Sequence, residues 1–186
     1  MITRKIYLYL SFTLALIPTF SLFAQITIAE TEIINAKQAY SAKNYTEALN
    51  RYKKAVELGN TSSLIDIGYM YEKGRGVSQS FIEAKKWYDK AATAKVKGAE
   101  HHIGFLYETG GTGLPQDYNA AMKQYKIAAE RGETASMLRI GMLYEKGRGV
   151  TLSLDKALEW YQRAEKSGSE ATTTMFIERV KKLMGK

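Results

Sequence analysis

Hydrophobic and small residues recur along this chain at the spacing that places them on one face of a helix. Leu64, Ile67, Gly68 and Tyr71 follow one another at intervals of three and four residues, and residues 84–91 keep the same spacing. Each pattern predicts an amphipathic helix. The glycines between them end the first helix, because glycine readily adopts the left-handed conformation found at helix C-termini. The segment therefore predicts a helix, a glycine loop and a second helix.

The same pattern occurs three times. Gly68, Gly104 and Gly141 are 36 and 37 residues apart. Four further sets of positions keep this register: Tyr71, Tyr107 and Tyr144; Ala84, Ala121 and Ala157; Tyr88, Tyr125 and Tyr161; Ala91, Ala128 and Ala164. A single helix pair cannot bury its apolar face alone, so such units stack on their neighbours. The sequence therefore predicts an all-α chain of stacked helix pairs.

The repeats are expected at about residues 60–95, 96–132 and 133–168. Ser80, Asp117 and Ser153 are the predicted N-caps of the three second helices, with Glu83 completing a capping box in the first. A shorter hairpin, residues 33–59, precedes the repeats, with Asn44 as its N-cap candidate. A last helix, 171–184, is predicted as a cap of the stack. Its apolar stripe contains Met175, Phe176, Val180, Leu183 and Met184.

The first residues have the pattern of an export signal. Arg4 and Lys5 precede an apolar run over residues 6–23, and Ala24 is a small residue suited to cleavage. We interpret residues 1–24 as a cleaved secretory signal peptide and residues 25–186 as the folded domain. The alternative is an uncleaved membrane anchor. Cleavage predicts a periplasmic or secreted bacterial protein without stable membrane insertion.

Composition excludes several kinds of site. The chain has no Cys and two His, so disulfides and thiolate metal sites are impossible and a histidine metal site is not expected. The formal charge is +8, and removal of Arg4 and Lys5 lowers it by two. Acidic residues lie between the basic ones along the helices, which is typical of a solvated exterior. We expect no cofactor and no nucleic-acid partner.

Two motifs resemble catalytic or ligand-binding sequences. Gly74-Arg75-Gly76 resembles a phosphate-binding loop, but it follows a predicted helix C-terminus, where the dipole repels anions. Ser153-Leu154-Asp155-Lys156 fits the S-x-x-K motif of penicillin-binding enzymes, but no S-D-N or K-T-G accompanies it. The sequence therefore indicates a protein that is not an enzyme.

The repeats resemble the Sel1-like repeat family, which is related to tetratricopeptide repeats. The third repeat matches the family pattern at Ser136, Ile140, Gly141, Tyr144, Gly147, Gly149, Val150, Ala157, Trp160, Tyr161, Ala164 and Gly168. Gln124 replaces the expected Trp in the second repeat, and Lys95 stands where a Gly is expected. The resemblance implies a right-handed α-solenoid of antiparallel helix pairs, used mainly to hold other proteins.

In such a solenoid the first helix of each pair lines the concave face. The residues predicted to bind a partner there are Ile65, Tyr69, Glu72, His101, Phe105, Glu108, Leu138, Met142 and Glu145. An apolar row beside a row of Glu resembles the core and rim of an interface. The alternative is that superhelical curvature buries the apolar row.

The Glu row lies near helix C-termini, where negative charge is unfavourable. Salt bridges to Arg75 or Arg148 would offset this in two repeats, and recognition of a basic partner segment is the alternative. His101 is expected either to reach the concave face or to be an ordinary surface histidine.

The sequence thus predicts an exported adaptor or scaffold that binds a protein or peptide through its concave face. The alternative, from analogy with secreted members of this family, is a periplasmic immunity protein that neutralises a secreted toxic effector. A hydrolase acting on cell-wall material is the least favoured hypothesis, because it depends on the Ser153 motif alone.

Overall fold

The computed structural model describes residues 3–111, 113–168 and 170–185, without the side chains of residues 3–20, 23 and 170–172. Within these ranges the chain is helical apart from turns and one isolated bridge between Gly111 and Leu114. The helices are α1 (Thr3–Ser41), α2 (Tyr45–Glu57), α3 (Ser63–Lys73), α4 (Phe81–Thr93), α5 (Ala99–Thr109), α6 (Tyr118–Glu130), α7 (Thr134–Lys146), α8 (Leu154–Lys166) and α9 (Glu170–Leu183).

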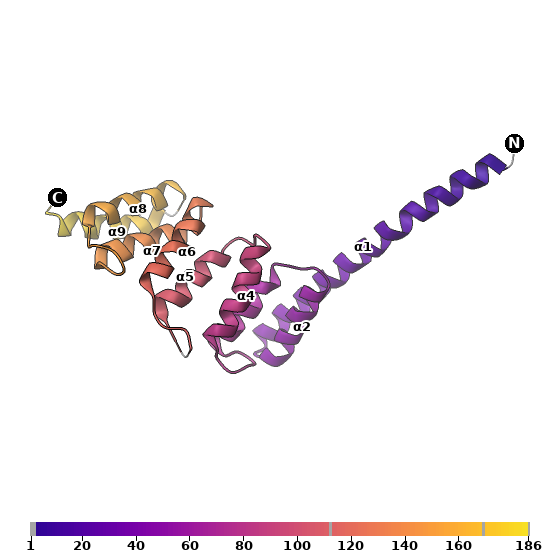
Figure 1. Ribbon diagram of the computed structural model, residues 1–186, viewed down its shortest axis with the longest axis horizontal. Coiled ribbons are helices and arrows are strands. Elements are labelled where there is room, and N and C mark those ends of the chain that lie inside the picture. The colour runs from indigo at the N-terminus through magenta and orange to yellow at the C-terminus, as the bar shows by residue number, and fades with distance from the viewer. Residues whose placement is uncertain (1–2, 112, 169, 186) are drawn as a thin grey trace.

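The helices form successive pairs, α1 with α2, α3 with α4, α5 with α6 and α7 with α8. Each pair packs on the next through its second helix, and α9 packs on α8 at the end of the row. Figure 1 shows this row from α2 to α9, with the N-terminal part of α1 projecting beyond it. The predicted all-α solenoid is confirmed.

The predicted signal segment falls mostly on residues whose side chains lie outside the described part of the chain. The first buried side chain described in α1 is Ala29, and Leu22 and Ile26 are exposed. No helix within the described residues is long and apolar enough to cross a membrane.

A glycine and a tyrosine hold the two helices of each repeat together. A Cβ added at Gly68 would lie 2.5 Å from the ring of Tyr88, and one at Gly104 would lie 2.7 Å from the ring of Tyr125. Gly141 has the same relation to Tyr161. The rings are fully buried. Only glycine leaves room for a tyrosine ring against the helix backbone, which is why these two residues recur in register.

Each glycine loop joins the two helices of one repeat and also contacts the preceding helix pair. Gly74 ends α3 in the left-handed conformation, as predicted. Gly76 has a φ of +75°, and a Cβ there would lie 2.6 Å from the backbone carbonyl carbon of Tyr45 at the start of α2. Each loop is therefore a packing element against the preceding helix pair, which supports the interpretation of Gly74-Arg75-Gly76 as a structural turn.

The N-caps of the second helices are confirmed. The side-chain oxygens of Ser80, Asp117 and Ser153 accept hydrogen bonds from backbone N–H groups in the first turns of α4, α6 and α8. Asn44 makes no such bond; its side-chain amide donates instead to Glu47. The capping box is also incomplete, because the Glu83 carboxylate pairs with Lys86.

The last helix departs from the predicted stripe. Ile177 and Val180 are its buried residues, with Phe176 and Met184 packed beside them. Met175 and Leu183 are 58% and 60% exposed, so their expected place in the stripe is wrong. They lie four residues on either side of Arg179, which places all three on one side of α9.

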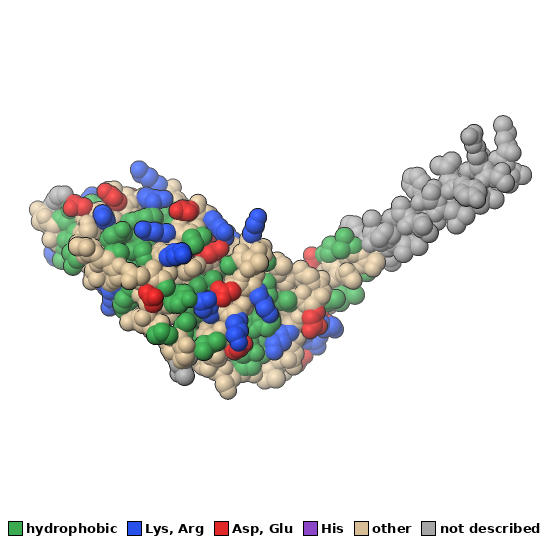
Figure 2. Space-filling model, viewed as in Figure 1, with side chains coloured by type: hydrophobic (Ala, Val, Ile, Leu, Met, Phe, Trp, Pro, Cys, Tyr) green, Lys and Arg blue, Asp and Glu red, His purple; other side chains and the backbone are tan. Residues whose placement is uncertain are grey.

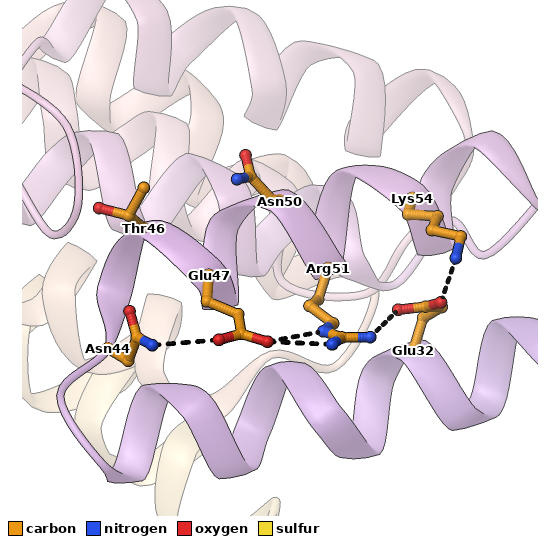
Figure 3. A pocket seen from close by; sticks show the side chains of 7 residues that line it. All are labelled: Glu32, Asn44, Thr46, Glu47, Asn50, Arg51 and Lys54. Carbon is orange, nitrogen blue, oxygen red and sulfur yellow. Dashed lines mark hydrogen bonds and ion pairs between the residues drawn. The ribbon is translucent and has the colours of Figure 1, made fainter.

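The opposite end of the solenoid is polar. A shallow hollow of about 560 Å³ at the α1–α2 hairpin is lined by seven polar or charged residues. Figure 3 shows the chain of interactions there: Arg51 lies between Glu47 and Glu32, and Lys54 reaches Glu32 from the other side. Lys54 and Arg51 lower the pKa of Glu32. A polar outer surface is what a terminal repeat of a solenoid needs to remain soluble.

Candidate partner-binding face

Each Glu of the predicted concave row is bonded to the tyrosine of its own repeat. The Tyr88 hydroxyl donates to Glu72 at 2.9 Å, Tyr125 to Glu108 at 2.6 Å and Tyr161 to Glu145 at 2.7 Å. These carboxylates sit four residues after the repeat glycines, so each ring crosses the glycine before its hydroxyl meets the carboxylate. The side chains of the three Glu are only 3%, 13% and 10% exposed.

A cation lies over each of these carboxylates. Lys73 is 2.6 Å from Glu72, Arg139 is 3.6 Å from Glu108, and Arg179 is 2.6 Å from Glu145. Arg139 and Arg179 come from the next first helix along the solenoid. The helix-terminal charge is thus compensated within the protein, although by other residues than the expected Arg75 and Arg148.

Burial and hydrogen bonding shift the titration of the tyrosines and of His101. Desolvation raises the pKa of Tyr125, and the carboxylate of Glu108 raises it further. His101 Nδ1 lies 2.8 Å from the Ser136 hydroxyl of α7, and its ring tilts against Tyr125. Burial lowers the pKa of His101 to about 4, so this ring is neutral at pH 7. The His101 side chain therefore lies in the contact between two repeats. This position is neither of the two that were expected for it.

The remaining apolar residues of the predicted site divide into two groups. Ile65, Leu138 and Met142 pack against the hydrophobic clusters between repeats. All five are half-buried, and the rings of Tyr69 and Phe105 also lie under cations. Packing therefore covers each side chain of the apolar row in part and leaves the rest exposed.

Tyr69 and Phe105 belong to a continuous cation–aromatic strip, which we define as Arg75, Tyr69, Lys73, Phe105 and Arg139. The Arg75 guanidinium lies 5.5 Å from the Tyr69 ring centroid, and Lys73 Nζ lies 5.5 Å from both aromatic rings. The guanidinium of Arg139 lies 5.3 Å from the ring of Phe105. Shared rings link the cations in sequence from the loop after α3 to α7, so the strip crosses three consecutive helix pairs.

The predicted site does not include the three cations of the strip. Arg75 is expected there only as a salt-bridge partner of the Glu row, and neither Lys73 nor Arg139 is predicted to contribute. The spacing of Glu to Tyr, which is 16, 17 and 16 residues in the three repeats, was available in the sequence. That spacing would have predicted that the carboxylates of the Glu row are bonded to tyrosines of the same repeats. It would also have predicted that the cations lie outside the carboxylates.

The described residues offer little for other chemistry. They contain no group of three or more His, Asp or Glu side chains placed to hold a metal ion. The Ser153 hydroxyl of the S-x-x-K motif accepts a hydrogen bond from the backbone N–H of Lys156, as an N-cap does. The strip can therefore act by contact: its rings offer apolar area, and its cations offer charge and N–H donors.

Comparison with known proteins identifies the repeats. The Sel1 repeat family model matches residues 38–60, 61–96, 98–133 and 134–169. The chain belongs to the Sel1 repeat family. Repeats of this family mediate protein–protein interactions, and the first match shows that the N-terminal hairpin carries part of the same pattern.

Solved Sel1 repeat structures share the fold. The chain is 34% identical to a Sel1 repeat protein from Oxalobacter formigenes, with a TM-score of 0.69 over 82% of this chain and 61% of that one. It is 31% identical to a protective antigen of uropathogenic Escherichia coli with this repeat fold, with a TM-score of 0.62 over 73% of this chain and 29% of that one.

Among curated proteins, the chain is similar to the exopolysaccharide production negative regulator of Rhizobium leguminosarum bv. viciae. The two are 28% identical over 152 residues, which are 75% of this chain and 57% of the regulator. The chain thus spans a little over half the length of that relative.

Proposed function

We propose that this Sel1 repeat protein is an exported scaffold that holds a protein or peptide partner along the cation–aromatic strip. The observation that carries the proposal is that Tyr69 and Phe105 are half-buried and lie beside cations, so their rings keep exposed area next to positive charge. Aromatic side chains that are partly covered and flanked by charges are frequent energetic anchors of interfaces.

The N-terminal segment supports the export part of the proposal. Basic residues, an apolar run and Ala24 form the pattern of a secretory signal. Because the described buried side chains of α1 begin at Ala29, removal of residues 1–24 would leave their packing intact. N-terminal sequencing of the chain recovered from its host should find Gln25 first. A mature chain that still begins at Met1 would contradict cleavage.

The partner-binding part is tested by affinity purification of the tagged chain from its host. A Tyr69→Ala/Phe105→Ala variant should lose the partners that the unaltered chain recovers. The matched control is Ile82→Ala/Leu152→Ala, which removes two exposed apolar side chains outside the strip. Equal recovery by the strip variant and the control would show that the strip is not the binding face.

A further inference from the structure

We infer that the strip recognises an acidic segment, in which carboxylates alternate with apolar side chains. This inference rests on the proposed function and specifies its partner. It reverses the charge expected from the Glu row, which suggested a basic partner.

The first step compares the exposure of acidic and basic side chains on the first helices. The acidic residues of α3, α5 and α7 are all buried or half-buried; they are Asp66, Glu72, Glu100, Glu108 and Glu145. The cations over them are more exposed, with values of 38% for the Lys73 side chain and 34% for Arg139. A partner approaching these helices therefore meets the cations first.

The second step is the occupancy of the carboxylates. Glu72 accepts from the Tyr88 hydroxyl and contacts Lys73, so both of its oxygens are engaged within the protein. The same holds for Glu108, which is bonded to Tyr125 and paired with Arg139. A basic partner would have to compete with these bonds, whereas an acidic partner would add to the unused donors of the cations.

The third step is that the strip holds positive charge in excess. Arg75 lies over the rings of Tyr40, Tyr45 and Tyr69 and has no carboxylate partner among the described residues. A guanidinium near aromatic rings but without a carboxylate partner has N–H donors available for a bidentate carboxylate.

Apolar area accompanies this charge. Tyr69 and Phe105 lie between the cations, and farther along the solenoid Met175 and Leu183 flank Arg179 on its exposed face. Figure 2 shows one face of the solenoid, on which basic and acidic side chains lie among hydrophobic ones. The fitting ligand therefore carries apolar as well as acidic side chains.

The contacts along the strip set the length of the ligand. Four links of 5.3–5.5 Å join its five residues, so the strip is at most about 22 Å long. An extended chain covers about 3.3–3.6 Å per residue, so roughly six residues span the strip.

The experiment is selection from a displayed library of random peptides about twelve residues long, which is longer than the roughly six residues that span the strip. The selected peptides should be rich in Asp and Glu interspersed with apolar residues, and raised salt should weaken their binding. The test variant is Arg75→Gln/Arg139→Gln, because Arg75 has no carboxylate partner and the Arg139 contact is the longest of the three ion pairs. We expect about tenfold weaker binding from this loss of charge-assisted contacts.

The matched control removes two cations that also lie on aromatic rings, but on second helices. Lys90 lies 4.3 Å from the Trp87 ring, and Arg163 lies 4.2 Å from that of Trp160. A Lys90→Gln/Arg163→Gln variant should bind the selected peptides like the unaltered chain. Circular dichroism and thermal melting of both variants exclude unfolding as the cause, and Arg139→Lys should restore part of the affinity.

The outcomes separate this inference from the proposed function. Selection of basic or neutral peptides that bind in a manner dependent on Tyr69 and Phe105 would overturn the acidic preference and leave the scaffold proposal in place. If the Arg75→Gln/Arg139→Gln variant binds the selected peptides as tightly as the unaltered chain, the acidic preference would be overturned as well. A library that yields no binder, together with partner recovery unaffected by Tyr69→Ala/Phe105→Ala, would overturn both.

Discussion

Replacement of Gly104 by Ala tests the central contact of the repeat. The added Cβ would lie 2.7 Å from Cδ1 and Cε1 of Tyr125, whereas carbon atoms pack at about 3.5–4.0 Å. The ring must therefore move by about 1 Å, and such overpacking costs about 1–3 kcal/mol. The same movement draws the Tyr125 hydroxyl away from Glu108, 2.6 Å distant, and a lost bond to a charged acceptor costs about 1.5–3 kcal/mol.

Two effects reduce this cost. Alanine favours the helix by about 1 kcal/mol relative to glycine, and the 13% exposure of Glu108 lets water replace part of the lost bond. The expected net loss is about 2–3 kcal/mol in the free energy of unfolding. Urea denaturation followed by circular dichroism measures it. A Gly104→Ala chain as stable as the unaltered one would refute the reasoning.

A double-mutant cycle separates the two contributions. Tyr125→Phe removes the hydroxyl but keeps the ring, so the hydrogen bond can be lost only once in Gly104→Ala/Tyr125→Phe. The double variant should therefore cost about 1–2 kcal/mol less than the two single variants together. Tyr118→Phe, whose ring lies under Arg148, is the matched control and should change little. Strict additivity would show that the ring does not move.

Three further predictions concern single side chains. Tyr88→Phe should lower the free energy of unfolding by about 1.5–3 kcal/mol, because Glu72 is nearly buried and loses its hydroxyl donor; urea denaturation measures the loss, and an unchanged midpoint would contradict it. Ser153→Ala should cost about 1 kcal/mol through loss of the cap of α8 in the same assay, whereas Ser153→Asp, which keeps an acceptor, should not. Stability should fall as pH drops from about 6.5 toward 4, by at most about 3 kcal/mol from His101, because the unfolded state takes up the proton before the folded state does; His101→Gln should flatten this dependence, and an unaltered slope would exclude His101 as its source.

The repeat architecture could be predicted from the sequence because it depends on local and periodic information. Glycines at fixed intervals mark the sites where a ring must approach a helix, and Ser80, Asp117 and Ser153 mark helix starts through a bond to their own backbone. Such signals do not require knowledge of distant contacts.

The site was harder to predict, because the state of a side chain depends on what reaches it from other helices. Glu145 has the spacing of a free surface residue, but Tyr161 of α8 and Arg179 of α9 both close on it. Arg179 lies 34 residues away, outside any repeat register. Met175 and Leu183 fit an inward stripe by sequence spacing alone, but α9 packs on α8 through Ile177 and Val180 and leaves both exposed. These outcomes follow from tertiary packing rather than from periodicity.

The tyrosine–glutamate pairs connect the stability of the solenoid with its surface charge. Each pair draws a carboxylate inward at the C-terminal end of a first helix, where it would otherwise repel the helix dipole. The cation drawn over the carboxylate stays outside, because its long side chain can lie on an aromatic ring and keep its head in water. One repeated contact therefore closes the interior and leaves the positive layer on the outside. A tyrosine-to-phenylalanine change should accordingly weaken binding of an acidic peptide as well as stability, since Glu108, already 3.6 Å from Arg139, would be free to pair with it more closely. If Tyr125→Phe lowers the stability but leaves the peptide affinity unchanged, the role of the pair in stability is separate from its role in binding.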